Sequence, residues 1–194
     1  MNFDRHIENI VRDAYIRVGV LFKGFISRDP NLMKKAYTTF IRPVIEYASS
    51  VWCPYKQKHI VAIEKVQRHF TRRIPALRDL SYGERLGLIE LETLELRRLK
   101  CDLILYYKIL TGISPLSCEH YSNYVNHGRS TRLQDKYVLQ KPFCRNKLIE
   151  NDFFVRRIDC WNSLPDNVKH CDSLYKFKRF LSTVDLSSFL VVKL

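Results

Sequence analysis

The feature that most constrains the fold is the spacing of the apolar residues, which recur every three or four positions over long stretches. Such stripes cover residues 7–25, 33–51 and 60–74. The clearest one precedes Gly112, a good C-terminal cap, and contains Leu96, Leu99, Leu103, Tyr107 and Leu110. Only 6 Gly and 7 Pro occur in 194 residues, so long helices are possible. The pattern predicts a mainly α fold.

Local signals predict where several helices begin and end. Asp29 followed by Pro30 is a typical helix start, with Asp as N-cap and Pro at the first helical position. Ser81 and Glu84 have the spacing of a capping box. Pro43 lies inside an apolar stripe and leaves two alternatives: a kinked helix, or one helix that ends while another begins.

The changes in pattern along the chain predict an ordered series of segments. Residues 113–152 are rich in Ser, Asn, Tyr and basic residues with weak periodicity, so we expect a linker or extended loop there, with a hairpin across Arg132 to Pro142 as one interpretation. The predicted segments are a helical bundle over 1–78, a helical continuation over 79–112, the linker over 113–152, a C-terminal helical segment over 153–183 and a tail over 184–194. The apolar tail from Phe189 to Val192 has no obvious partner.

The formal net charge of +13 is the strongest indication of a partner. Such a surplus repels itself in the compact state unless a polyanion offsets it. Nucleic acid is the leading candidate and an anionic membrane surface the second, while a basic surface without a partner is the plain alternative. No stretch is long and apolar enough to span a bilayer, and no signal peptide is evident, so we expect an intracellular protein without a membrane partner.

The six cysteines are scattered and include no C-x-x-C pair, which argues against a structural zinc site. The nearest approaches to ligand pairs are Cys118 with His120 and His170 with Cys171. We expect reduced, mostly buried thiols and no metal or other cofactor.

Sequence motifs for catalysis are missing from the chain. It has no Gly-rich phosphate loop, and no two acidic residues are adjacent, so the paired aspartates of a two-metal polymerase site are absent. Glu46, Glu64 and Glu84 fit helix-surface or capping roles better than catalytic ones. We therefore expect no enzyme activity from this chain.

Basic residues are the positive signal, because they gather on three predicted helices. A row of Lys and Arg along a helix can follow phosphates by charge without reading sequence, although a single such row is more often a solvated face. The candidate nucleic-acid-binding residues are Lys56, Lys58, Lys65, Arg68, Arg72, Arg73, Arg97, Arg98, Arg156 and Arg157. Four aromatic residues could stack on bases, but their apolar neighbours favour core roles: Tyr47, Trp52, Tyr55 and Trp161.

An ordered set of short strings carries a family resemblance. The strings are Ile41-Arg42-Pro43-Val44-Ile45-Glu46-Tyr47-Ala48-Ser49, Val51-Trp52-Cys53-Pro54, Ile63-Glu64-Lys65-Val66-Gln67-Arg68, Tyr82-Gly83-Glu84-Arg85-Leu86, Leu94-Glu95-Leu96-Arg97-Arg98, Asp102-Leu103, Tyr107-Lys108-Ile109-Leu110, Phe153-Phe154-Val155-Arg156-Arg157, Trp161-Asn162-Ser163-Leu164-Pro165 and Phe177-Lys178. Together they resemble the C-terminal part of non-LTR (LINE-type) retrotransposon reverse transcriptases of the Jockey and CR1 kind.

The resemblance runs from about Phe3 to Leu181 and implies a place in a larger polymerase. Residues 3 to about 75 match the helical thumb, which packs against the template–primer duplex, and residues from about Leu80 match the C-terminal extension. The catalytic palm and the endonuclease of the family precede this region, so Met1 is expected to lie downstream of all catalytic motifs.

These features imply a non-catalytic fragment of an RNA-directed DNA polymerase. The implied partners are RNA or an RNA–DNA duplex and the palm of a full-length reverse transcriptase, in the nucleus or cytoplasm. An interaction module, or a domesticated or non-functional remnant, is the alternative.

Overall fold

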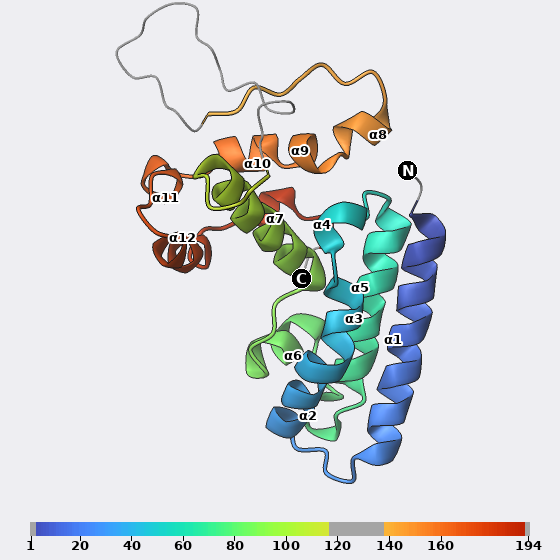
Figure 1. Ribbon diagram of the computed structural model, residues 1–194. Coiled ribbons are helices and arrows are strands. Elements are labelled where there is room, and N and C mark those ends of the chain that lie inside the picture. Colours follow the sequence, from blue (N-terminus) through green and yellow to red (C-terminus); the bar gives the residue numbers. More distant parts are fainter. Residues whose placement is uncertain (1–2, 117–137, 193–194) are drawn as a thin grey trace, which may run out of the picture. The chain divides into compact units, whose positions relative to one another are not determined.

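The computed structural model describes residues 3–116 and 138–192, and over these residues the protein is built mainly of helices, as the apolar spacing predicts (Figure 1). The chain forms two compact units. The first unit contains Met1–Arg98 together with Leu190–Leu194, and the second contains Leu99–Phe189. The predicted boundary at residue 78 differs from this division, because residues 79–98 fold back onto the helices before them.

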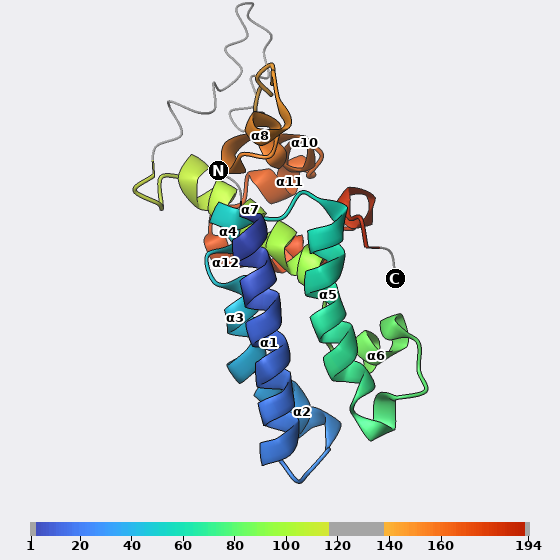
Figure 2. The same cartoon turned by 90° about the vertical axis from the view of Figure 1, so that its right-hand side faces the viewer.

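The first unit is a helical bundle in which two long helices lie side by side (Figures 1 and 2). Its elements are α1 (Asp4–Gly24), α2 (Pro30–Ala36), the π-helical segment η1 (Tyr37–Ile41), α3 (Arg42–Glu46), α4 (Ser49–Trp52), α5 (Gln57–Arg72), the 3-10 turn η2 (Pro75–Leu77), α6 (Tyr82–Leu88) and the first residues of α7 (Leu94–Leu110). The side-by-side pair is α1 and α5, and both are amphipathic.

The predicted caps are present at the starts of α2 and α6. The Asp29 carboxylate accepts a hydrogen bond from the backbone N–H of Leu32 at 2.8 Å. The backbone N–H of Ser81 donates to the Glu84 carboxylate at 2.8 Å, and the Ser81 hydroxyl accepts from the Glu84 N–H, which completes a capping box. Both caps satisfy backbone donors that the first helical turn leaves without partners.

The chain passes Pro43 without a break in helical structure. The π-helical segment η1 directly precedes α3, in which Pro43 is the second residue. Pro43 has no N–H to donate, and its ring would clash with the carbonyl of Thr39 in a regular α-helix, so a wider turn accommodates it. The helix then ends before Ala48, whose φ of 51° lies in the left-handed region.

The core of the first unit forms where α1, η1 and α5 meet. Phe70 is fully buried at the centre and stacks on Tyr37 with 4.7 Å between ring centroids, while Phe22 lies 5.6 Å away on another side. Ala14 and Val18 of α1 are also fully buried. Small residues on α1 opposite large rings allow the helices to pack closely.

Two polar side chains of α5 are buried in this core and connect it to three other segments. The Glu64 carboxylate is 1% exposed; it accepts from the Tyr82 hydroxyl and, at 3.0 Å, from the backbone N–H of Leu94. Gln67 is fully buried and accepts from the Tyr37 hydroxyl at 2.8 Å. Its amide donates to the Tyr82 hydroxyl at 3.0 Å and to the Glu92 carbonyl at 2.9 Å. The network fixes residues 82–94 against α5.

The second unit is built around aromatic side chains. It contains the rest of α7, then α8 (Lys147–Glu150), α9 (Phe153–Arg156), α10 (Ile158–Asn162), α11 (Asp166–Lys169), α12 (Leu174–Leu181) and the 3-10 turn η3 (Ser187–Phe189). Phe177 is fully buried between Tyr107, at 4.3 Å between ring centroids, and Trp161, at 6.0 Å. The Tyr107 hydroxyl donates to the Cys171 carbonyl at 2.7 Å.

The predicted linker over 113–152 is described in part. It contains the short helix α8, and the hairpin predicted across Arg132 to Pro142 lies largely outside the described residues. Within the described part, the Asn162 side chain accepts from the Leu139 N–H at 3.0 Å and donates to the Leu139 carbonyl at 2.8 Å. This paired contact holds the end of the linker against α10.

The apolar tail has a partner that the sequence did not indicate. The backbone N–H groups of Val191 and Val192 donate to the two carboxylate oxygens of Glu95, at 3.0 and 2.8 Å. Both partners belong to the first unit. The tail is therefore held through its backbone, which no side-chain pattern can reveal.

The buried Glu64 carboxylate predicts a pH dependence of stability. Burial raises the pKa of Glu64 above its ordinary 4.5, and the bonds from Tyr82 and Leu94 and the charge of Arg98 offset this in part. The native state then binds the proton more tightly than the unfolded state. The stability that Glu64 contributes is greatest below pH 4.5 and falls as the pH rises through the folded pKa. We expect the free energy of unfolding of the wild type, minus that of Glu64→Gln, to fall with rising pH in urea titrations.

Glu84 provides the matched control, because its pKa is lowered by the hydrogen bonds from Ser81. The corresponding difference for Glu84→Gln should change in the opposite direction, rising with pH up to about 4.5. A difference for Glu64→Gln that is constant or rises with pH would contradict the raised pKa.

Candidate nucleic-acid interface

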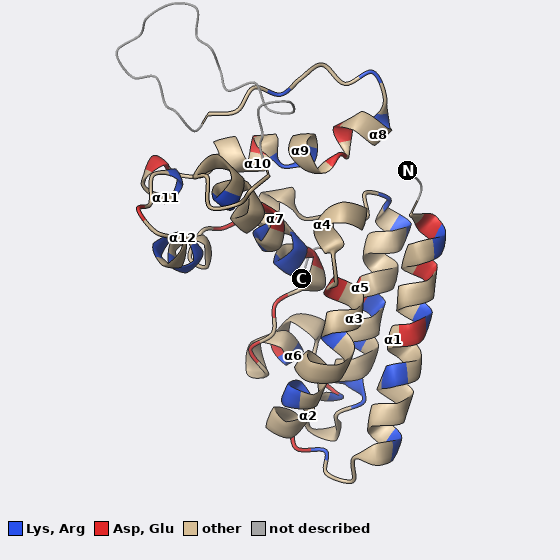
Figure 3. Cartoon of the chain, viewed as in Figure 1, with Lys and Arg blue, Asp and Glu red and all other residues tan. Residues whose placement is uncertain are grey.

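The outer face of α5 carries the exposed part of the predicted basic set. Lys58, Lys65, Arg68 and Arg72 are all exposed and are separated by seven, three and four positions. This spacing puts them on one side of a helix. We call these four residues the α5 stripe. Lys and Arg positions are spread along the length of α5 (Figure 3).

The geometry of the α5 stripe suits a run of phosphates. Arg72 lies fourteen positions after Lys58, which corresponds to a rise of about 21 Å at 1.5 Å per residue. Within residues 3–116 and 138–192, no Asp or Glu forms an ion pair with a member of the stripe. The acid that the sequence places between them, Glu64, faces the core, so the outer face of α5 is more purely basic than its sequence indicates.

Aromatic rings hold two of the arginines on the surface. The Arg68 guanidinium lies over the Tyr82 ring, 4.4 Å from its centroid. The Arg73 guanidinium lies over the Phe22 ring at 4.2 Å. Both arginines remain exposed. Cation–π contacts fix their direction while leaving the N–H groups able to meet an anion.

Two other predicted residues of the first unit have carboxylate partners. The Lys56 ammonium is 2.5 Å from the Asp4 carboxylate, which joins the start of α5 to α1. The Arg97 guanidinium donates to both oxygens of Glu46, at 2.5 and 3.1 Å, which joins α7 to α3. These cations hold helices together, so we leave them out of the interface.

Arg98 is 2% exposed and belongs to the interior of the first unit. Its positive charge helps to lower the pKa of the buried Glu64 carboxyl, against the larger effect of desolvation. A charge at this position balances a buried acid instead of meeting a ligand.

Arg156 and Arg157 meet at one buried carboxylate. Asp102 is 1% exposed and accepts from Arg156 at both oxygens, at 3.0 and 3.1 Å, and from Arg157 at 3.0 Å. The arginine side chains are themselves 7% and 18% exposed. The three residues form a structural clamp within the second unit that joins α7 to α9 and the residue after it.

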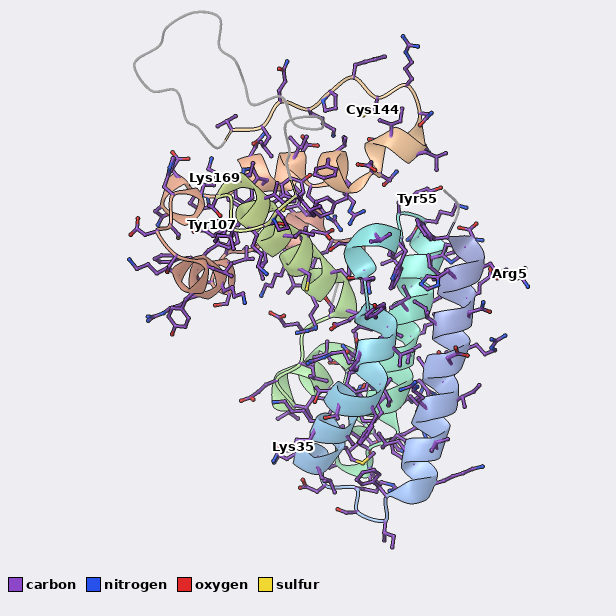
Figure 4. The ribbon with its side chains drawn as sticks, in the orientation of Figure 1. Arg5, Lys35, Tyr55, Tyr107, Cys144 and Lys169 are labelled. Carbon is purple, nitrogen blue, oxygen red and sulfur yellow. The ribbon has the colours of Figure 1, made fainter. Side chains whose placement is uncertain are left out.

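The four candidate aromatic residues also divide into buried and exposed ones. Trp52 and Trp161 are buried, which confirms their predicted core roles. Tyr47 is 82% exposed, so the core role predicted for it is wrong: the turn at Ala48 directs it outward. Tyr55 is 42% exposed, which leaves it at the surface next to Lys56 (Figure 4).

Other predicted features can be placed only over part of the chain. Among the described cysteines Cys160 is buried, whereas Cys101 is exposed and the others are half-buried, so the expectation of mostly buried thiols is wrong for this part of the chain. Over the described ranges, no group of His, Cys, Asp or Glu is arranged to hold a metal ion. No helix there is long and apolar enough to cross a membrane. Cys118 and His120 lie outside the described residues.

One basic residue next to the α5 stripe was missed. Arg85 of α6 lies three positions after Tyr82, so both side chains share a side of that helix, and the Arg85 guanidinium is 5.6 Å from the Tyr82 ring centroid. The i, i+3 spacing could have indicated this neighbour of Tyr82. Nothing in the sequence indicated that Arg85 and Arg68 would both lie over the Tyr82 ring.

Comparisons with known proteins give one distant likeness. No protein-family model matches this chain, and no solved structure matches it. The chain is similar to an uncharacterized protein of Caenorhabditis elegans, B0403.1, with 25% identity over 115 residues. The matched stretch is 58% of this chain and 58% of the relative, so the match spans less than two thirds of either protein.

The Asp102 clamp predicts a large effect of a single substitution. Asp102→Ala would leave two buried guanidinium groups without their carboxylate, which should lower the stability of the second unit by about 3–5 kcal/mol. In a Trp52→Phe background, Trp161 is the remaining tryptophan and reports this unit in urea titrations followed by fluorescence.

Asp172→Ala is the matched control. Asp172 pairs with Lys176 on the surface, where the side chains are 85% and 58% exposed, so its loss should cost less than about 1 kcal/mol. Equal effects of the two substitutions would show that Asp102 is not a clamp.

Proposed function

We propose that this chain is a non-catalytic part of a retrotransposon-type reverse transcriptase that binds template–primer nucleic acid through the α5 stripe. The observation that carries the proposal is the row of four exposed cations on one face of α5, without an acid among them. Lys and Arg in such a row neutralise successive phosphates by charge and make binding strongly salt-dependent. The ligand is RNA or an RNA–DNA duplex, met in the nucleus or the cytoplasm.

The contacts inside each unit support the resemblance on which this proposal draws. The strings that resemble the family contain both members of the pairs that hold the helices: Glu46 with Arg97, Glu64 with Tyr82, and Asp102 with Arg156. The strings thus include residues that build the structure, and they also contain Lys65 and Arg68 of the α5 stripe.

The proposed role does not require polymerase chemistry from this chain. A two-metal phosphoryl-transfer site needs carboxylates that converge on two ions, and the sequence contains no adjacent pair of acids. The Glu residues considered as candidates have structural contacts: Glu46 binds Arg97, Glu64 is in the buried network, and Glu84 caps α6. The role that we propose is to hold nucleic acid for a catalytic palm.

The salt dependence of binding tests the proposal. Replacing Lys58, Lys65 and Arg72 with Gln should reduce the slope of log K against log salt for an RNA–DNA hybrid by about 0.9 per lost phosphate contact, or about 2.7 in all. Fluorescence anisotropy of a labelled hybrid over a KCl series measures it.

A second triple variant controls for net charge. Arg5→Gln, Lys23→Gln and Lys35→Gln removes the same three charges from exposed positions on α1 and α2, and Figure 4 shows Arg5 and Lys35 directed away from the bundle. This variant should keep the wild-type slope. Equal slopes in the two triple variants would count against the stripe as the binding surface.

An apolar hollow on the first unit favours a second candidate function, docking to a protein. It is lined by Arg17, Val20, Leu21, Gly24, Phe25 and Phe40, with a volume of about 330 Å³. Val20 and Phe40 are 64% and 54% exposed. Exposed apolar groups around a hollow are typical of a protein contact, and the palm of an intact reverse transcriptase is the partner that the resemblance implies.

Sedimentation velocity of the chain mixed with a purified palm-containing reverse transcriptase tests this candidate. Phe40→Glu should weaken association roughly 10- to 100-fold, the equivalent of about 1.5–3 kcal/mol for a buried Phe. Tyr47→Glu is the control, since Tyr47 is an exposed aromatic residue outside the hollow. Absence of a complex with the wild-type chain would exclude the docking role.

A further inference from the structure

Two arginines from two helices lie over a single tyrosine ring, and a third is one helical turn away from the first. Arg68 and Arg85 both place their guanidinium groups over Tyr82, at 4.4 and 5.6 Å from its centroid. Arg72 lies one turn after Arg68 on the same side of α5, and its positive charge helps to lower the pKa of Arg85. The cluster thus joins the C-terminal half of α5 to α6.

Arg85 is the unusual member, because it is buried and only partly satisfied. It is 7% exposed, and one terminal N–H group donates to the Leu80 carbonyl at 3.2 Å. Its Nε has no hydrogen-bond partner among the described residues. A buried donor without a partner is costly, by about 1–3 kcal/mol and more for a charged group. The arrangement therefore leaves donor capacity for a ligand.

The charges around Arg85 are of its own sign. Burial lowers the pKa of Arg85, Tyr82 offsets this in part, and the positive charges of Arg72 and Arg68 lower the pKa further, although the group stays protonated. Within the described part of the chain, no carboxylate forms an ion pair with any of the three arginines. The Tyr82 hydroxyl donates to Glu64 in the core, and Glu64 forms no ion pair with the arginines in the described part of the chain.

We infer that Arg68, Arg72 and Arg85 form a defined seat for one phosphate group, next to the diffuse attraction of the α5 stripe. A phosphate matches the cluster because its oxygens accept from several guanidinium groups at once, and because its charge offsets their mutual repulsion. This inference rests on the proposed function, since the phosphate is assigned to the backbone of the bound nucleic acid. Free inorganic phosphate offers the same oxygens and charge, and the experiments below distinguish it from a phosphate of the nucleic-acid backbone.

The first measurement uses inorganic phosphate and the full chain. The melting temperature should rise with phosphate concentration and saturate, relative to chloride at matched ionic strength, because a ligand that binds the native state stabilises it. Arg85→Gln and the exposed variant Arg72→Gln should each abolish the saturable rise, whereas Arg5→Gln should keep it. Arg72→Gln keeps the test valid if Arg85→Gln does not fold.

The second measurement separates the two sources of phosphate. With the labelled RNA–DNA hybrid, Arg85→Gln should reduce the salt slope by about 0.9, which corresponds to one phosphate contact. Arg85→Lys keeps the positive charge but loses the planar, forked guanidinium group. This variant should therefore bind the hybrid more weakly than the wild type. A saturable effect of inorganic phosphate with an unchanged slope in both Arg85→Gln and Arg72→Gln would overturn the assignment to the nucleic-acid backbone.

The outcomes for the seat and for the stripe are distinguishable. If the Lys58, Lys65 and Arg72 triple variant flattens the slope but phosphate has no saturable effect and Arg85→Gln has the wild-type slope, the seat is wrong and the stripe stands. If the triple variant keeps the wild-type slope, the proposed function itself fails.

Discussion

Glu64 and Gln67, two polar residues buried on the inner face of α5, hold the first unit together. Their hydrogen bonds reach Tyr37 in η1, Tyr82 in α6 and the backbone of Glu92 and Leu94 at the start of α7. A buried donor or acceptor left without a partner costs about 1–3 kcal/mol, so each of these segments is held in one register. Without this network, residues 82–94 would lose the buried hydrogen bonds that specify their position on α5.

The network also determines what α5 can present to solvent. Because Glu64 faces inward, the only acid in the helix is removed from its surface, and the exposed face is left to Lys58, Lys65, Arg68 and Arg72. Tyr82, which Glu64 and Gln67 hold in place, in turn positions Arg68 and Arg85. The interior hydrogen bonds and the surface charges are thus consequences of one arrangement of α5.

In the second unit, a buried acid draws cations into the fold, whereas in the first unit the inward-facing Glu64 leaves cations on the surface. Asp102 on α7 brings two arginines together inside the fold, so residues that resemble a nucleic-acid contact in the sequence serve as its counter-ions. Arg97 with Glu46 and Lys56 with Asp4 follow the same pattern in the first unit. A count of Lys and Arg therefore overstates the number of cations available to a ligand, because some of them belong to long-range pairs inside each unit.

The sequence by itself determined the helices, their caps and the amphipathic faces of α1, α5 and α7, because these depend on residues three or four positions apart. It also identified Lys58, Lys65, Arg68 and Arg72 as candidate nucleic-acid-binding residues. Only the tertiary structure decided which cations are exposed. The partners of Lys56, Arg97, Arg156 and Arg157 are about fifty residues away in sequence, and no local pattern records them. Three other features likewise depend on packing between segments that are distant in sequence. They are the π turn before Pro43, the contact of the tail with Glu95 and the approach of Arg85 to Arg68.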